Sequence, residues 1–187
     1  MSISHIATTR IVRTSLVLGF IAVVGFAERS SSNVAWQKFS LHDQGLTVSM
    51  PGEPKSKKLH STSFIGDIVT HEYYLDEGLD SYSVDFTDLP GFAVAFSGND
   101  IIYEHAKGAL LLDTLSKPIS FTDVTLNGVT GKKLVYDTPT KPGHPEMQGE
   151  ARFFLTGDRL YIADAVVEMK GGNEKLARFF ASLEIKP

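Results

Sequence analysis

The sequence predicts an α+β domain in which helices pack on an antiparallel β-sheet. Two observations predict this fold class. Short segments with alternating apolar and polar residues follow one another along the chain, and the hydrophobic period changes to that of a helix only twice. Strands therefore follow strands without the strand–helix–strand alternation of a parallel sheet, so we expect neighbouring strands to pair antiparallel. A length of 187 residues fits one such domain.

The first 27 residues have the three parts of a secretory signal peptide. Arg10 and Arg13 precede an apolar run over residues 15–27, and Gly25 and Ala27 suit a signal-peptidase site. Cleavage after Ala27 would export the domain to the periplasm or the extracellular space. The alternative is an uncleaved segment that anchors the protein, although a membrane span needs about 20 apolar residues. No cysteine follows the run, so attachment as a lipoprotein is excluded.

Cleavage would leave a serine-rich linker over residues 28–35 and a single domain over residues 36–187. This remainder has 16 basic and 22 acidic residues, a formal charge of −6. An acidic domain lacks the basic face that phosphate contacts need, so we expect no nucleic-acid partner. We expect contact with a membrane only if the N-terminal segment is retained.

The first half of the domain is expected to form strands joined by tight turns. Alternation predicts strands over residues 46–50, 59–65, 68–75 and 80–87. Proline and glycine predict turns at residues 51–54, 66–67 and 76–78. In the last of these strands Tyr82, Val84 and Phe86 share one face. The basic cluster of Lys55, Lys57 and Lys58 is interpreted as part of a solvated loop.

The second half begins and ends with a helix. The first runs from Asn99 or Asp100 to about Leu115, before Pro118. Its expected apolar side comprises Ile101, Ile102, Ala106, Ala109, Leu112 and Leu115. Strands follow over residues 119–126, 130–137, 148–156 and 159–168, with hairpin turns at Asn127-Gly128 and Gly157-Asp158. The last helix starts at residues 171–173 and buries Leu176, Phe179, Phe180 and Leu183, and residues 184–186 add a short strand.

Four stretches together resemble a group of small exported bacterial domains with the PsbP-like fold. They are residues 46–54 (LTVSMPGEP), 127–133 (NGVTGKK), 157–161 (GDRLY) and 177–183 (ARFFASL). The fold is shared by extrinsic photosystem proteins and Ran-binding nuclear import factors, and the resemblance implies an α/β/α sandwich from Trp36 to the C-terminus. It also implies a non-catalytic binding or assembly role by analogy. No partner-binding motif of either branch is matched, so no functional residue carries over.

The sequence contains no recognisable catalytic or cofactor motif. A thiol nucleophile is excluded by the lack of cysteine, and Ser97 lacks the first glycine of Gly-x-Ser-x-Gly, so it is interpreted as a loop residue. Residues 128–133 lack the spacing of a P-loop, and a Rossmann fingerprint is missing. Asp85, Asp88, Asp113 and Glu150 are candidates for an acid–base pair, but the sequence does not bring any two together. We expect no enzyme activity and no cofactor.

The histidines lack the local spacing of a metal site. His42, His60, His71, His105 and His144 contain no pair at i, i+2 or i, i+4. His71 and His105 are interpreted as core or boundary residues of a strand and a helix. His144 lies with Glu146 in a proline-rich loop over residues 138–146, which is interpreted as a connection between strands, with a two-ligand surface metal site or a stiff docking loop as the alternatives.

A second unexplained segment covers residues 90–98 and contains Phe92, Val94 and Phe96 between turn residues. It is interpreted as a short edge strand or a loop covering the core, with an exposed patch that docks a partner as the alternative. The preferred function is an exported, non-enzymatic binding or assembly module whose partner is a protein or an envelope component. The alternatives are a small-ligand or lipid carrier with an apolar cavity between sheet and helix, and a hydrolase or metal-dependent enzyme without a recognisable motif.

Overall fold

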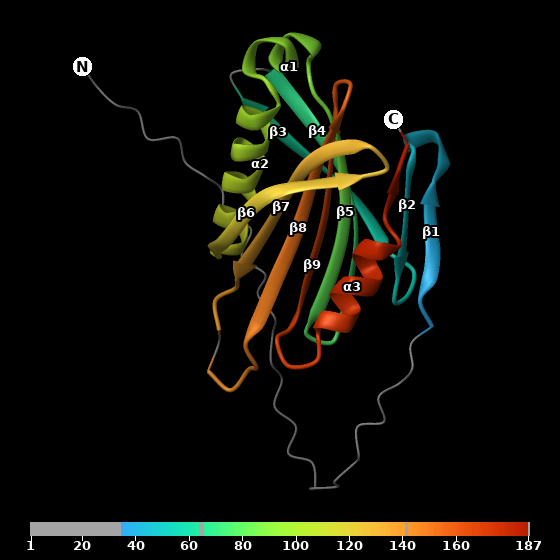
Figure 1. Ribbon diagram of the computed structural model, residues 1–187, viewed down its shortest axis with the longest axis vertical. Helices are drawn as coiled ribbons and strands as arrows, with labels where there is room; N and C mark the ends of the chain where they lie inside the picture. The colour runs from blue at the N-terminus through green and yellow to red at the C-terminus, as the bar shows by residue number, and fades with distance from the viewer. Residues whose placement is uncertain (1–34, 64–65, 141, 187) are drawn as a thin grey trace, which may run out of the picture. The chain divides into compact units, whose positions relative to one another are not determined.

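The computed structural model describes residues 35–63, 66–140 and 142–186 (Figure 1). The proposed signal peptide and residues 28–34 of the linker lie outside the described residues. The strands are β1 (Gln37–Leu41), β2 (Leu46–Met50), β3 (Lys55–Ser63), β4 (Gly66–Glu77), β5 (Asp80–Asp88), β6 (Lys117–Leu126), β7 (Val129–Asp137), β8 (Met147–Thr156), β9 (Arg159–Glu168) and β10 (Glu184–Ile185). The helices are the 3-10 turn η1 (His42–Gln44), α1 (Gly91–Ser97), α2 (Asn99–Thr114) and α3 (Asn173–Ala181). No helix in the described ranges is long and apolar enough to cross a membrane.

The main sheet has seven strands in the order β3-β4-β5-β9-β8-β7-β6, and every neighbouring pair is antiparallel. This confirms the predicted antiparallel sheet. Hairpins connect β3 to β5 and β6 to β9 in sequence, and pairing of β5 with β9 joins the two halves. The predicted turn between β6 and β7 is confirmed, because Asn127 and Gly128 both have positive φ, at 51° and 83°.

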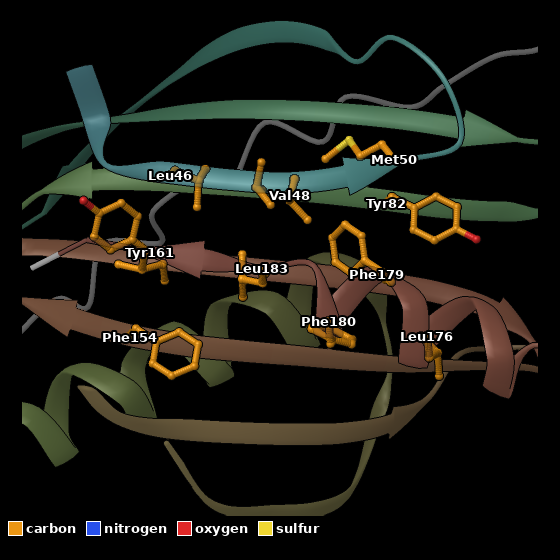
Figure 2. Close-up of a cluster of buried hydrophobic side chains, with 14 of the residues drawn as sticks. Leu46, Val48, Met50, Tyr82, Phe154, Tyr161, Leu176, Phe179, Phe180 and Leu183 are labelled. Carbon is orange, nitrogen blue, oxygen red and sulfur yellow. The ribbon is translucent and has the colours of Figure 1, made fainter. Parts of the chain in front are cut away.

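The first face of the main sheet carries the larger core. The small sheet β1-β2-β10 and helix α3 cover this face, and their apolar side chains meet those of β5 and β9 (Figures 1 and 2). Phe179 of α3 is fully buried between Tyr82, at a ring distance of 5.4 Å, and Phe180, at 5.0 Å. The predicted inward faces of the last helix and of the strand with Tyr82, Val84 and Phe86 are confirmed.

The second face carries a smaller core beneath α2. Tyr103 is the buried centre of the helix: its hydroxyl accepts the Leu155 N–H at 3.0 Å and donates to the Thr130 carbonyl at 3.3 Å. The predicted apolar side of this helix is wrong in part. Ile101, Ala109, Leu112 and Leu115 are exposed. The predicted Ile102 and Ala106 pack inward, together with Leu110 and Leu111, which were not predicted. Apolar residues occur nearly all round α2, so periodicity alone does not identify the buried side.

Three further interpretations are corrected by the structure. His105 is exposed on α2, because its side of the helix faces away from the sheet. The lysine cluster lies on β3, an edge strand on which charged side chains discourage pairing with other chains, instead of in a loop. Residues 91–97 form helix α1 instead of a strand or a loop, because the spacing of Phe92 and Phe96 also fits a helical turn.

Candidate functional site

A polar hollow of about 420 Å³ lies at the end of the main sheet where β8 turns into β9. Its walls come from the η1 turn, the end of β5, the β8–β9 turn and the C-terminal segment. The lining residues are His42, Asp43, Gln44, Gly45, Asp88, Thr156, Asp158, Arg159, Tyr161 and Lys186. The hollow therefore combines three carboxylates with two cationic side chains and several neutral hydrogen-bonding groups.

Arg159 organises one wall of the hollow. Its guanidinium donates two hydrogen bonds to the Asp88 carboxylate, the longer one 2.8 Å. It donates a third to the side-chain carbonyl of Gln44. The cation also lies 5.0 Å from the Phe86 ring centroid. The hydrogen bond from Arg159 lowers the pKa of Asp88. Arg159 thus holds its neighbours in place, with its own charge already matched by a carboxylate.

Backbone contacts fix the opposite wall. The Tyr161 hydroxyl donates to the Gln44 carbonyl at 2.7 Å, and the Lys186 N–H donates to the Gly45 carbonyl at 2.8 Å. The Thr156 hydroxyl is buried and has no hydrogen-bond partner among the described residues. The arrangement offers hydrogen bonds and charge, but the hydrogen bonds of the described residues include no activated nucleophile beside a base.

Helix α1 begins beside this hollow and carries the exposed aromatic residues. The Leu89 N–H donates to the Asp158 carbonyl at 2.8 Å, which ties the chain entering α1 to the β8–β9 turn. Ala93 is buried and Val94 packs on the second core. Phe92 is 56% exposed and Phe96 is 88% exposed. We call the hollow together with Phe92 and Phe96 the end surface.

A row of carboxylates crosses the second face of the main sheet on β4, β5 and β9. Glu72 lies opposite Asp85 in the β4–β5 register, and Asp164 lies on the adjacent strand, opposite Ser83. The Asp85 Oδ1 atom is buried without a hydrogen-bond partner in the described part of the chain. Glu72 pairs with Lys57 at 2.9 Å. Sequence reasoning missed this row, because only the strand register brings residues so distant in the chain together.

Burial away from water is the main cause of the raised pKa values of Asp164 and Asp85 in this row. It raises the pKa of Asp164 to about 7, against the smaller opposing effect of a 2.8 Å hydrogen bond from the Tyr136 hydroxyl. It raises the pKa of Asp85 as well, with the Glu72 and Asp164 charges acting in the same direction. Shifted carboxyls often mark functional sites, but they also occur in structural networks. In the described ranges, no three histidine or acidic side chains are placed to share a metal ion.

The structure separates the two groups of residues that sequence reasoning singled out. Phe92, Val94 and Phe96 lie near the β8–β9 turn, whereas His144 and Glu146 lie in the loop before β8. The ten residues of β8 separate these ends by roughly 30 Å. His144 and Glu146 are exposed. His71 stacks on Phe86 with the ring centroids 4.6 Å apart, which supports its interpretation as a boundary residue.

The acidic residues considered for an acid–base pair also have separate partners or positions. Asp88 binds Arg159, Glu150 binds Arg152 at 2.8 Å, and Asp113 is exposed on α2. Asp85 instead joins the carboxylate row. None of the four forms a hydrogen bond with another of them among the described contacts.

Comparison with solved structures shows that the chain has a PsbP-like fold. It is similar to cyanobacterial PsbP (CyanoP) from Synechocystis sp. PCC 6803, with a TM-score of 0.56 and 11% sequence identity over 86% of this chain and 98% of that one. A Pseudomonas aeruginosa protein of unknown function aligns with a TM-score of 0.40 and 10% identity, over 81% of this chain and 98% of its own. No family model and no curated protein sequence matches the chain.

Proposed function

We propose that this protein is an exported, non-enzymatic binding module that docks a protein partner of the cell envelope on its end surface. The observation that carries the proposal is the exposure of Phe92 and Phe96, two aromatic side chains one turn apart on α1. Exposed aromatic residues that lie close together are typical of protein-binding surfaces, where they fill pockets of the partner.

The surroundings of these aromatic residues support a protein partner. The hollow beside α1 supplies the mixed polar and charged groups of an interface rim, including Asp158 and Lys186. Arg159 and its partners hold the hollow in shape before binding, which lowers the entropy cost of association. A basic membrane-binding face would need cations around the aromatic residues, whereas Asp88 and Asp158 flank the start of α1.

The alternatives receive less support from the geometry. A carrier requires an apolar cavity, but fully buried side chains such as Phe179, Met50 and Val48 fill the space beneath α3 and the small sheet (Figure 2). For an enzyme, the carboxylate row is the strongest candidate. However, its carboxylates lie side by side on neighbouring strands, and none of them lines the hollow.

The test is crosslinking in the native envelope followed by mass spectrometry, with the double variant F92S/F96S. We expect the variant to lose the captured partner and to keep the melting temperature of the wild type. The matched control is L79S/M169S, which removes two comparably exposed side chains, 50% and 46% exposed, at the opposite end of the main sheet, after β4 and after β9. Equal capture by F92S/F96S and wild type would refute the proposal. A large loss of stability would show that the two aromatic residues serve the core.

A further inference from the structure

The outward face of α2 carries an apolar stripe that no described part of the chain covers. Ile101 is 51% exposed, Leu112 is 75% exposed, and Leu115, which caps the helix, is 72% exposed. At about 100° per residue these three positions and Gly108 fall within an arc of about 60°. Exposed apolar residues scattered singly are ordinary, but a stripe along a helix of 16 residues is a packing surface.

Gly108 lies at the middle of this stripe without a reason inside the monomer. A Cβ atom added there would meet nothing within 4 Å. Glycine is one of the least favourable residues in a helix interior, and alanine would fit the monomer better. A glycine at such a position allows the backbone of another element to approach closely. The structure therefore indicates a second helix that crosses α2 at Gly108.

The residues around Gly108 are arranged symmetrically. Ile101 and Leu115 are each seven residues from it, two helical turns in opposite directions. In an antiparallel pair related by a two-fold axis at Gly108, Ile101 of each copy meets Leu115 of the other. Leu112 then covers the aliphatic stem of Glu104. A dimer of this kind needs a self-complementary surface, and the stripe meets that requirement.

Charges along α2 favour the same antiparallel arrangement. The first half of the helix carries Asp100 and Glu104, whose side chains are 84% and 56% exposed although each pairs with a lysine of its own chain, Asp100 with Lys132 at 3.3 Å and Glu104 with Lys107. Lys117 is exposed just beyond the other end. Antiparallel packing brings Lys117 of one copy near Asp100 of the other and sets the two helix dipoles in opposite directions.

We infer that α2 is a self-association surface, on which two copies of this protein pack antiparallel around a two-fold axis at Gly108. The occupant of the stripe is therefore a second copy of the chain. This inference rests on α2 alone and does not depend on the partner proposed for α1.

Sedimentation equilibrium of the protein expressed from the full chain tests the inference. We expect the wild type to form dimers at micromolar concentration. Leu112→Lys should raise the dissociation constant at least about 100-fold, because it forces a charge into an apolar contact. The matched control is Leu79→Lys, at a 50% exposed position in the β4–β5 turn, which should leave the dimer intact. A wild type that stays monomeric at about 100 µM, or an L112K variant that dimerises like the wild type, overturns the inference.

A crosslink tests the register of the two helices. The chain has no cysteine, so any disulfide formed by a single-cysteine variant must join the introduced cysteines of two copies. A residue on the two-fold axis meets its own copy, so Gly108→Cys should form a disulfide-linked dimer under mild oxidation, whereas Leu79→Cys should not. Equal crosslinking of the two variants overturns the register. Because L112K leaves Phe92 and Phe96 unchanged, loss of the dimer with retained partner capture separates this inference from the proposed function.

Discussion

Replacing Asp164 with asparagine should stabilise the protein at neutral pH and have little effect in acid. The pKa of this carboxyl is raised from 3.8 to about 7, so the folded protein holds a proton that the unfolded chain releases. A carboxyl with a raised pKa stabilises the fold fully below pH 4, and this stability is lost as the pH rises to about 7. A shift of about three units corresponds to about 4 kcal/mol. Asparagine resembles the protonated acid and keeps an oxygen for the Tyr136 hydroxyl.

The measurement is urea unfolding of wild type and D164N at several pH values. The stability of D164N relative to wild type should increase by about 2–3 kcal/mol between pH 5 and pH 7.5. Asp88→Asn is the control, because Arg159 lowers the pKa of Asp88. Asp88 is then ionised in both states above pH 5, so the difference between D88N and wild type should stay constant in this window. A constant difference for D164N as well would show that Asp164 is ionised in the folded protein.

Three substitutions test the packing of the two faces. Phe179→Ala removes a fully buried ring and should lower the free energy of unfolding by about 3–5 kcal/mol in urea titrations, whereas a loss below 1 kcal/mol would contradict the packing of α3. Tyr103→Phe should cost about 1–3 kcal/mol, because the Leu155 N–H loses its acceptor; an unchanged transition would show that α2 does not depend on this bond. Gly149→Ala places a Cβ 2.0 Å from the Tyr136 ring and should cost about 2–3 kcal/mol, with a shifted near-ultraviolet circular dichroism spectrum; wild-type stability would show that the ring lies elsewhere.

The strands were the most predictable part of this fold. Alternation identified β2 and β9 with the observed bounds, and it placed Tyr82 and Val84 on the buried face of β5. Strand side chains alternate between faces, so a strand with one buried face has alternating apolar and polar residues in its sequence. Helix α3 was equally predictable, because its large apolar residues, Leu176, Phe179 and Phe180, lie on one side and are buried. The strand β1 was not predicted, since its first two residues are exposed and its last three are half-buried, which gives no clear alternation.

The candidate sites were less predictable, for two physical reasons. The segment with Phe92 and Phe96 alternates between large and small residues like a strand, yet it forms a helix that buries only Ala93. The alternation therefore did not predict which of its residues are buried. The carboxylate row depends on the order of strands. Asp85 and Asp164 are neighbours only because β5 pairs with β9, a contact between the two halves of the sheet that no local pattern encodes.

The two layers that cover the sheet differ in a way that points to where function lies. On the first face, the apolar residues of α3 are matched by those of β2, β5 and β9, so this layer is accounted for by stability alone. On the second face, α1 and α2 expose Phe96 and Leu112, which gain no stability from burial, and the glycine at position 108 weakens α2 relative to alanine. Contacts within the described residues do not compensate for these features. Binding of other molecules to α1 and α2 would compensate for them, which is why both proposals concern this layer.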